Sequence, residues 1–111
     1  MADFKRRAPT VDRLISSVNV EEDRRIALVG KITHIDKSGS ICEFEDFSGK
    51  TILIVPHISI LENVSEGEIY RVTGTILRHE NGFELKVEII QKINNLNMNI
   101  YKEYMRVSGN L

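Results

Sequence analysis

The chain has 111 residues, which is enough for one hydrophobic core and one domain but not for two. Apolar residues make up 41% of the sequence, an ordinary globular share that excludes wholesale disorder. Its 15 basic and 16 acidic side chains leave a net charge of -1, so a basic surface for gripping nucleic acid must be local or be supplied by a partner.

The cysteine and histidine content argues against a disulfide framework and a metal site. Cys42 is the one cysteine, and His34, His57 and His79 lack metal-ligand spacing, so we expect no metal and no other cofactor. No apolar run approaches the roughly 20 residues that span a bilayer, and the first residues lack the apolar stretch of a signal peptide. We expect a soluble intracellular protein, cytoplasmic and nucleoid-associated or, in a eukaryote, nuclear, with no membrane contact.

The first 24 residues are expected to form an N-terminal arm. Pro9 disfavours helix at the residue before it, so any helix must follow it. Apolar residues then recur at helical spacing, and the piece is either a short helix or a loop pinned by them. These residues are Val11, Leu14, Ile15 and Val18.

Residues 25–93 read as a barrel of five β-strands. Gly30 and Gly74 each lie at the centre of a β-rich run, within the similar phrases LVGKI and VTGTI. Glycine weakens a strand interior unless the strand bends sharply or another backbone comes close, so the repeat predicts a sheet that closes on itself. Turn residues separate the expected strands. The strands are residues 26–36, 41–46, 51–55, 69–77 and 83–91.

Three of these strands carry clear polarity patterns. Residues 41–46 place Cys42 and Phe44 on one face and Glu43 and Glu45 on the other. Residues 51–55 are nearly all apolar, which predicts burial on both faces or cover from another element. The last strand alternates, and its expected inward set is Phe83, Leu85, Val87 and Ile89.

Two helical segments complete the predicted fold. Apolar residues between Pro56 and Gly67 indicate a short helix or packed loop that plugs one end of the barrel. Residues 94–111 are expected to form a C-terminal helix, capped by Asn94 or Asn95 and helical through Val107. The predicted fold class is mainly β: a five-stranded OB-fold barrel with a short plug helix and a C-terminal α-helix, a fold that binds oligonucleotides and oligosaccharides.

The sequence offers no catalytic arrangement. Ser38 and Ser48 are turn residues without a nucleophile elbow, and Glu43 and Glu45 share the face expected to be solvated. We therefore expect neither an enzyme nor a small-molecule substrate.

The signal for direct binding of single-stranded nucleic acid is modest. Such binding needs aromatic platforms and a basic groove. The well-placed rings are Phe47 and Phe83, and Phe83 is expected to be buried because it begins the alternating core set. The candidate nucleic-acid-binding residues are Lys31, Lys37, Phe47, Lys50, Arg71, Arg78 and Lys86.

The C-terminal helix carries two adjoining apolar stripes, where one stripe is enough to cover a barrel. Two interpretations remain open: a helix packed on its own barrel, or a helix that joins partner helices in a small bundle. Tyrosine and methionine are enriched at interfaces. The candidate interface residues are Leu96, Met98, Ile100, Tyr101, Tyr104 and Met105.

Nearly the whole chain resembles the small subunit of replication protein A in its archaeal form. The resemblance lies in residues 7–16 (RAPTVDRLIS), 28–39 (LVGKITHIDKSG), 44–50 (FEDFSGK), 72–76 (VTGTI) and 96–104 (LNMNIYKEY). It implies one OB barrel whose C-terminal helix joins those of the middle and large subunits. It further implies that the larger subunits do most of the single-stranded DNA binding in replication, repair and recombination, and that the small one mainly assembles the complex.

Other functions stay open at this point. The small subunit of the telomere-capping complex has the same design, and DNA polymerase accessory subunits share it. A hypothesis of a different class is a self-sufficient module that binds single-stranded nucleic acid through its basic loops.

Overall fold

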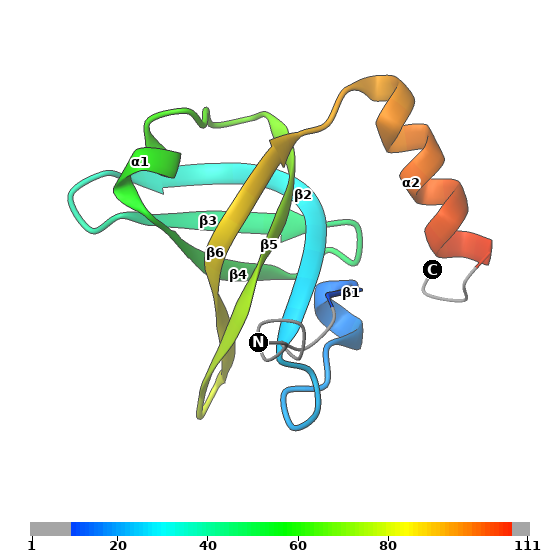
Figure 1. The fold of residues 1–111 in the computed structure, drawn as a ribbon, viewed down its shortest axis with the longest axis horizontal. Coiled ribbons are helices and arrows are strands. Elements are labelled where there is room, and N and C mark those ends of the chain that lie inside the picture. The colour runs from blue at the N-terminus through cyan, green and yellow to red at the C-terminus, as the bar shows by residue number, and fades with distance from the viewer. Residues whose placement is uncertain (1–9, 108–111) are drawn as a thin grey trace, which may run out of the picture.

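The computed structural model describes residues 10–107, and within residues 95–98 it describes the backbone alone. Figure 1 shows a β-barrel followed by a helix that lies beside it. The elements in chain order are β1 (Val11–Asp12), the 3-10 helix η2 (Ile15–Ser17), β2 (Arg25–Asp36), β3 (Ile41–Asp46), β4 (Thr51–Pro56), α1 (Ile58–Leu61), β5 (Ile69–His79), β6 (Gly82–Lys92) and α2 (Asn95–Val107).

The long strand β2 closes the barrel by pairing on two sides. Its first half runs antiparallel to β5, and its second half runs antiparallel to β3. From β3 the sheet continues through β4 to β6, which pairs in parallel with β4 and antiparallel with β5. The ring β2-β3-β4-β6-β5 therefore returns to β2, and the predicted five-stranded OB-type barrel is confirmed.

At Gly30 and Gly74 the backbone of a neighbouring strand comes very close. A Cβ atom on Gly30 would lie 2.3 Å from the carbonyl oxygen of Glu45, and one on Gly74 would lie 2.0 Å from the carbonyl oxygen of Lys86. Any side chain would therefore push a neighbouring backbone away. The repeated glycine phrases are explained by this close approach, which the closure of a small barrel requires.

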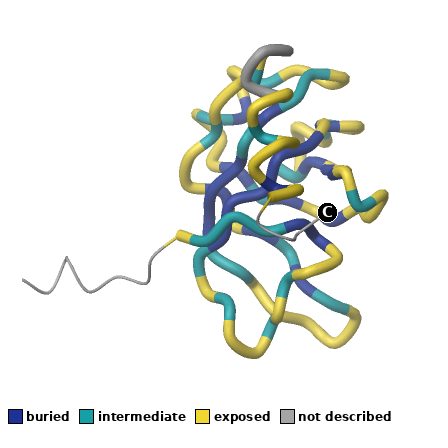
Figure 2. Tube along the Cα trace, turned by 90° about the vertical axis from the view of Figure 1, so that its right-hand side faces the viewer, coloured by how far each residue is buried: buried dark blue, intermediate teal, exposed yellow. Residues whose placement is uncertain are grey.

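The core fills the barrel interior with alternate side chains of every strand. On β3, Cys42 and Phe44 are fully buried while Glu43 and Glu45 are exposed, as the alternation predicts. Figure 2 shows buried segments in the middle of the molecule and exposed segments mostly at the outer turns. The fully buried side chains include Ile26, Leu28, Ile32, Ile54, Val72 and Leu85.

Two predictions about burial are wrong. Residues 51–55 are not buried on both faces, because β4 belongs to the barrel wall and its outer side chains, such as Leu53 at 37% exposed, face outward. Ile89 is 49% exposed although it continues an alternating pattern. Thr73 pairs with Ile89 but Gly74 pairs with Val87, so this bulge skips one residue and turns Ile90 toward the core instead.

Residues 10–24 form neither a single short helix nor a plain loop. They contain β1, which pairs in parallel with the start of β2, and then η2. The side chains of Leu14 and Ile15 are buried. This part of the chain therefore packs against the barrel rather than standing apart from it.

The short helix between β4 and β5 matches the predicted plug. The ring nitrogen Nδ1 of His57 accepts the main-chain N–H of Ser59 at 3.2 Å, which caps the first turn of α1. Leu61 at the helix end is buried in the core. The apolar spacing after Pro56 thus reflects a genuine helix of one turn.

Candidate interaction site

The outer face of β3 and β4 is poorly suited to holding a phosphate backbone. Its exposed residues on β3 are Glu43 and Glu45, and those on β4 are Thr51 and Leu53. None of these carries an aromatic ring or a positive charge. Carboxylates repel phosphates, and stacking needs exposed rings, so this face lacks both contributions that single-strand binding uses.

Phe47, in the turn between β3 and β4, contacts the C-terminal helix. Its ring centroid lies 5.9 Å from that of Tyr101, with the planes tilted by 35°. The ammonium of Lys102 lies 5.0 Å from the centre of the Phe47 ring. The predicted nucleic-acid residue Phe47 and the predicted interface residue Tyr101 therefore meet, and both help to hold α2 on the barrel.

One stripe of α2 is turned toward the barrel. Met105 is completely buried, and Tyr101, one turn before it, is half-buried. The hydroxyl of Tyr101 is buried without a hydrogen-bond partner in the part of the chain that is described. Burial, and after it the negative charge of Asp12, raises the pKa of this hydroxyl above its ordinary value. This inner stripe accounts for the interpretation in which the helix covers its own barrel.

The adjoining stripe of α2 is exposed. Ile100 is 60% exposed, Tyr104 is 54% exposed and Val107 is 74% exposed. These residues follow one another at spacings of four and three, so they form a continuous apolar strip along the helix. Val107 was not among the predicted interface residues, although its spacing of seven from Ile100 could have identified it. Leu96 and Met98 lie in the first turn, where the side chains are outside the described residues.

A groove of about 470 Å³ lies between α2 and the barrel. Arg71 and Asp12 line the groove and form an ion pair whose nitrogen and oxygen are 3.0 Å apart. Val29 and Ile93 contribute apolar walls, and Ile100, Tyr101 and Tyr104 form the helix side. Ile100 and Tyr104 therefore belong both to the exposed strip and to the lining of the groove.

The predicted basic residues are spread over three strands and two turns. Lys31 is on β2, Arg71 and Arg78 are on β5, and Lys86 is on β6, while Lys37 and Lys50 lie in turns. Arg71 is paired with Asp12, and Arg78 is paired with Glu21 at 3.3 Å. Lys31 stands directly opposite Glu45 in the β2–β3 register. Neutralisation of this kind weakens a phosphate track.

Phe83 is 8% exposed, so its ring lies in the core, as the alternation of its strand predicts.

The three histidines each contact a nearby group. His34 lies 3.6 Å from Glu66, and His79 lies 3.9 Å from Glu84. Within residues 10–107, no three side chains of the kinds that bind metals come together. Nor does any helix in that range have the length and apolar character needed to cross a membrane.

Comparison with solved structures identifies the fold. No family model matches the sequence, and no curated protein matches it. The telomere capping protein Ten1 from Saccharomyces pombe is similar with a TM-score of 0.63 and 17% identity, over 92% of this chain and 97% of that one. Replication protein A from U. maydis, bound to single-stranded DNA, is similar with a TM-score of 0.63 and 15% identity, over 90% of this chain and 89% of that one.

A third neighbour comes from a bacterium. The hypothetical protein YgiW from E. coli has a TM-score of 0.57 and 23% identity, over 71% of this chain and 83% of that one. At such identities the likeness establishes architecture alone. The chain is an OB-fold protein, similar in structure to subunits of replication protein A and to the telomere capping protein Ten1.

Proposed function

We propose that this chain is the small OB-fold subunit of a complex that binds single-stranded DNA, and that its main task is assembly through α2. The observation that carries the proposal is the second apolar stripe of α2. Met105 and Tyr101 already attach the helix to its own barrel, yet Ile100, Tyr104 and Val107 remain exposed along the neighbouring stripe. Contiguous exposed apolar surface on a small protein marks an interaction site.

The proposed partners are larger OB-fold subunits whose helices pack against this stripe, as in the heterotrimer of replication protein A. Single-stranded DNA would then be held mainly by those partners, in replication, repair and recombination. The acidic outer face of β3 and the ion-paired Arg71 and Arg78 support this division of labour. The proposal includes no catalytic step, and it places the complex with the DNA, in the nucleoid or nucleus.

The small subunit of a telomere-capping or polymerase accessory complex would use the same stripe. Ten1 and replication protein A match this chain with the same TM-score of 0.63. The proposal is therefore made at the level of the shared design, an OB barrel with an assembling C-terminal helix, and the accompanying chains decide between the complexes.

Purification of the native chain with its partners tests the proposal. Mass spectrometry is expected to identify larger chains with OB-fold domains, and the assembled particle is expected to be retained on immobilised single-stranded DNA. A chain that purifies alone, or with partners that do not bind nucleic acid, would contradict the proposal.

Titration of the isolated chain with a deoxythymidine oligonucleotide separates the proposal from a self-sufficient binding module. We expect weak binding, because Arg71 and Arg78 are ion-paired and the outer face of β3 carries Glu43 and Glu45. Tight binding that falls steeply with salt concentration would favour the self-sufficient module instead.

A further inference from the structure

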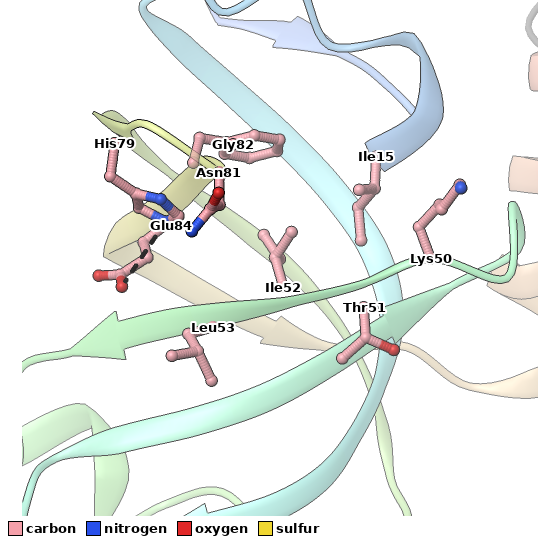
Figure 3. A pocket seen from close by; sticks show the side chains of 10 residues that line it. Ile15, Lys50, Thr51, Ile52, Leu53, His79, Asn81, Gly82 and Glu84 are labelled. Carbon is pink, nitrogen blue, oxygen red and sulfur yellow. Dashed lines mark ion pairs between the residues drawn. The ribbon is translucent and has the colours of Figure 1, made fainter.

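The barrel wall is incomplete between β4 and β6. The two strands are paired only from Ile54 to Pro56 of β4, which lie opposite Leu85 and Val87 of β6. Before Ile54 the two strands diverge, and a cavity of about 390 Å³ opens between the start of β4 and the β5–β6 turn. Figure 3 shows this opening, with Ile52 and Ile15 on one side and Asn81 and His79 at the hairpin.

The floor of the opening consists of the least covered part of the core. Ile15 and Ile52 are each 9% exposed and Phe83 is 8% exposed, whereas every other member of the core cluster is at most 4% exposed. All three residues line the opening. An apolar group placed there would therefore complete the burial of three core side chains at once.

The open edge of β4 presents main-chain hydrogen-bonding groups. The N–H of Asp46 donates to the carbonyl of Lys50 at 3.2 Å, and the hydroxyl of Ser40 donates to the carbonyl of Pro56 at 2.8 Å. Both acceptors therefore face β3. Since successive residues of a strand direct these groups to opposite sides, the N–H and C=O of Thr51 face the opening. Thr51 comes before Ile54, which is the first residue of β4 that pairs with β6.

The surroundings favour a peptide over a nucleic acid. Glu84 lines the opening, and Glu45 is exposed on the adjacent strand, so phosphates would be repelled. Phe83 is too deeply buried to offer a ring face for stacking. Lys50, at the rim, is exposed and forms no ion pair within residues 10–107, which suits a single acidic side chain.

We propose that an extended segment of a partner protein binds in this opening as an added strand. Its main chain pairs with Thr51, and one of its apolar side chains lies over Ile15, Ile52 and Phe83. An acidic residue beside that side chain pairs with Lys50. This is strand addition at an open sheet edge, in which main-chain bonds give affinity and the pocket gives specificity. The opening shares no residue with the groove beside α2.

Panning this 111-residue chain against a phage-displayed library of random linear peptides tests this site. The enriched peptides are expected to alternate apolar and polar residues and to share an acidic residue. Thr51→Pro removes the N–H that faces the opening, at the first position of a strand, where proline is tolerated. Thr51→Val keeps that N–H and is the matched control.

The affinity of a synthetic copy of the best peptide is expected to fall about tenfold or more for Thr51→Pro and to change less than about twofold for Thr51→Val. Lys50→Glu gives an independent measurement that does not alter the backbone. It should weaken binding, whereas Lys86→Glu, at another exposed position of the barrel outside the opening, should not.

Three results would overturn the site: a library that yields no enriched peptide, peptides that bind the Thr51→Pro and wild-type chains equally, or peptides indifferent to Lys50→Glu. An oligonucleotide that shifts the amide signals of residues 50–53 in place of any peptide would assign the opening to nucleic acid instead.

Discussion

The main-chain N–H of Ile15 donates to the buried carboxylate of Asp46 across 2.6 Å. This bond joins η2 to the end of β3, two segments separated by 31 residues. The other carboxylate oxygen of Asp46 accepts the N–H of Ser48 at 2.9 Å, so one side chain also shapes the β3–β4 turn. Asp46 thereby fixes both the N-terminal segment and the turn that carries Phe47 toward α2.

Asp46→Ala should therefore destabilise the chain by about 2–3 kcal/mol, because the N–H of Ile15 would stay buried without an acceptor. Asp36→Ala is the matched control, since its carboxylate accepts similar turn bonds from Ser38 and Gly39 but is exposed. Urea unfolding monitored by circular dichroism measures the free energy of unfolding of both variants. Equal losses for the two variants would refute the special role of Asp46.

The glycines at the strand crossings should not tolerate alanine. Gly30→Ala and Gly74→Ala each place a methyl group against a backbone carbonyl, so each should cost at least about 3 kcal/mol. Gly39→Ala is the control, because its Cβ would meet only side-chain atoms, of Asp36 at 3.4 Å and of Ile41 at 3.7 Å. Unfolding midpoints close to wild type for either crossing variant would show that the barrel can close without this approach.

Cys42 should report opening of the core. Burial, and after it the charge of Glu66, raises the pKa of the thiol to about 11, and the side chain is fully buried. The native thiol should therefore react slowly with a disulfide reagent at pH 8 and react completely in urea. Complete labelling of the folded protein within seconds would contradict this burial.

The same thiol predicts that the free energy of unfolding depends on pH. Since the folded pKa lies above the unfolded value of 9.0, the folded state disfavours the thiolate. Its stabilising contribution is complete below pH 9 and is lost as the pH rises toward 11. Unfolding free energies measured across this window should fall more for the wild type than for Cys42→Ala, and parallel curves would rule the effect out.

The two stripes of α2 should respond differently to truncation. Met105→Ala removes a fully buried side chain and should cost about 2–4 kcal/mol and speed hydrogen exchange along α2. Ile100→Ala, at a position 60% exposed, should leave the isolated chain nearly unchanged. Similar losses from both variants would mean that the strip is not free in the monomer.

Much of the fold follows from local sequence patterns, since glycine placement and alternation report directly on strand crossing and burial. The crossings at Gly30 and Gly74 and the alternation around Phe44 are such cases. The bulge that exposes Ile89 does not follow from a local pattern, because it depends on how β5 and β6 pair over their whole length. Nor does the apolar run in β4 show by itself that Leu53 faces outward.

The division of the helix surface was equally hidden in the sequence. Two adjoining apolar stripes do not reveal which one faces the barrel, and that choice depends on Phe47 far away in the chain. The same contact explains why Phe47, a reasonable stacking residue by its position in a turn, lies against Tyr101 and Lys102 instead. Long-range packing decided both points.

The most direct measurement of the proposed role compares co-purification of two variants with that of the wild type. The double variant Ile100→Glu/Tyr104→Glu changes only exposed positions of the α2 strip, and Ile58→Glu changes a residue that is 53% exposed on α1. Assembly through the strip predicts that the double variant stays folded but loses its partner subunits, while Ile58→Glu retains them. Partner recovery equal to that of the wild type in the double variant would contradict the proposed function.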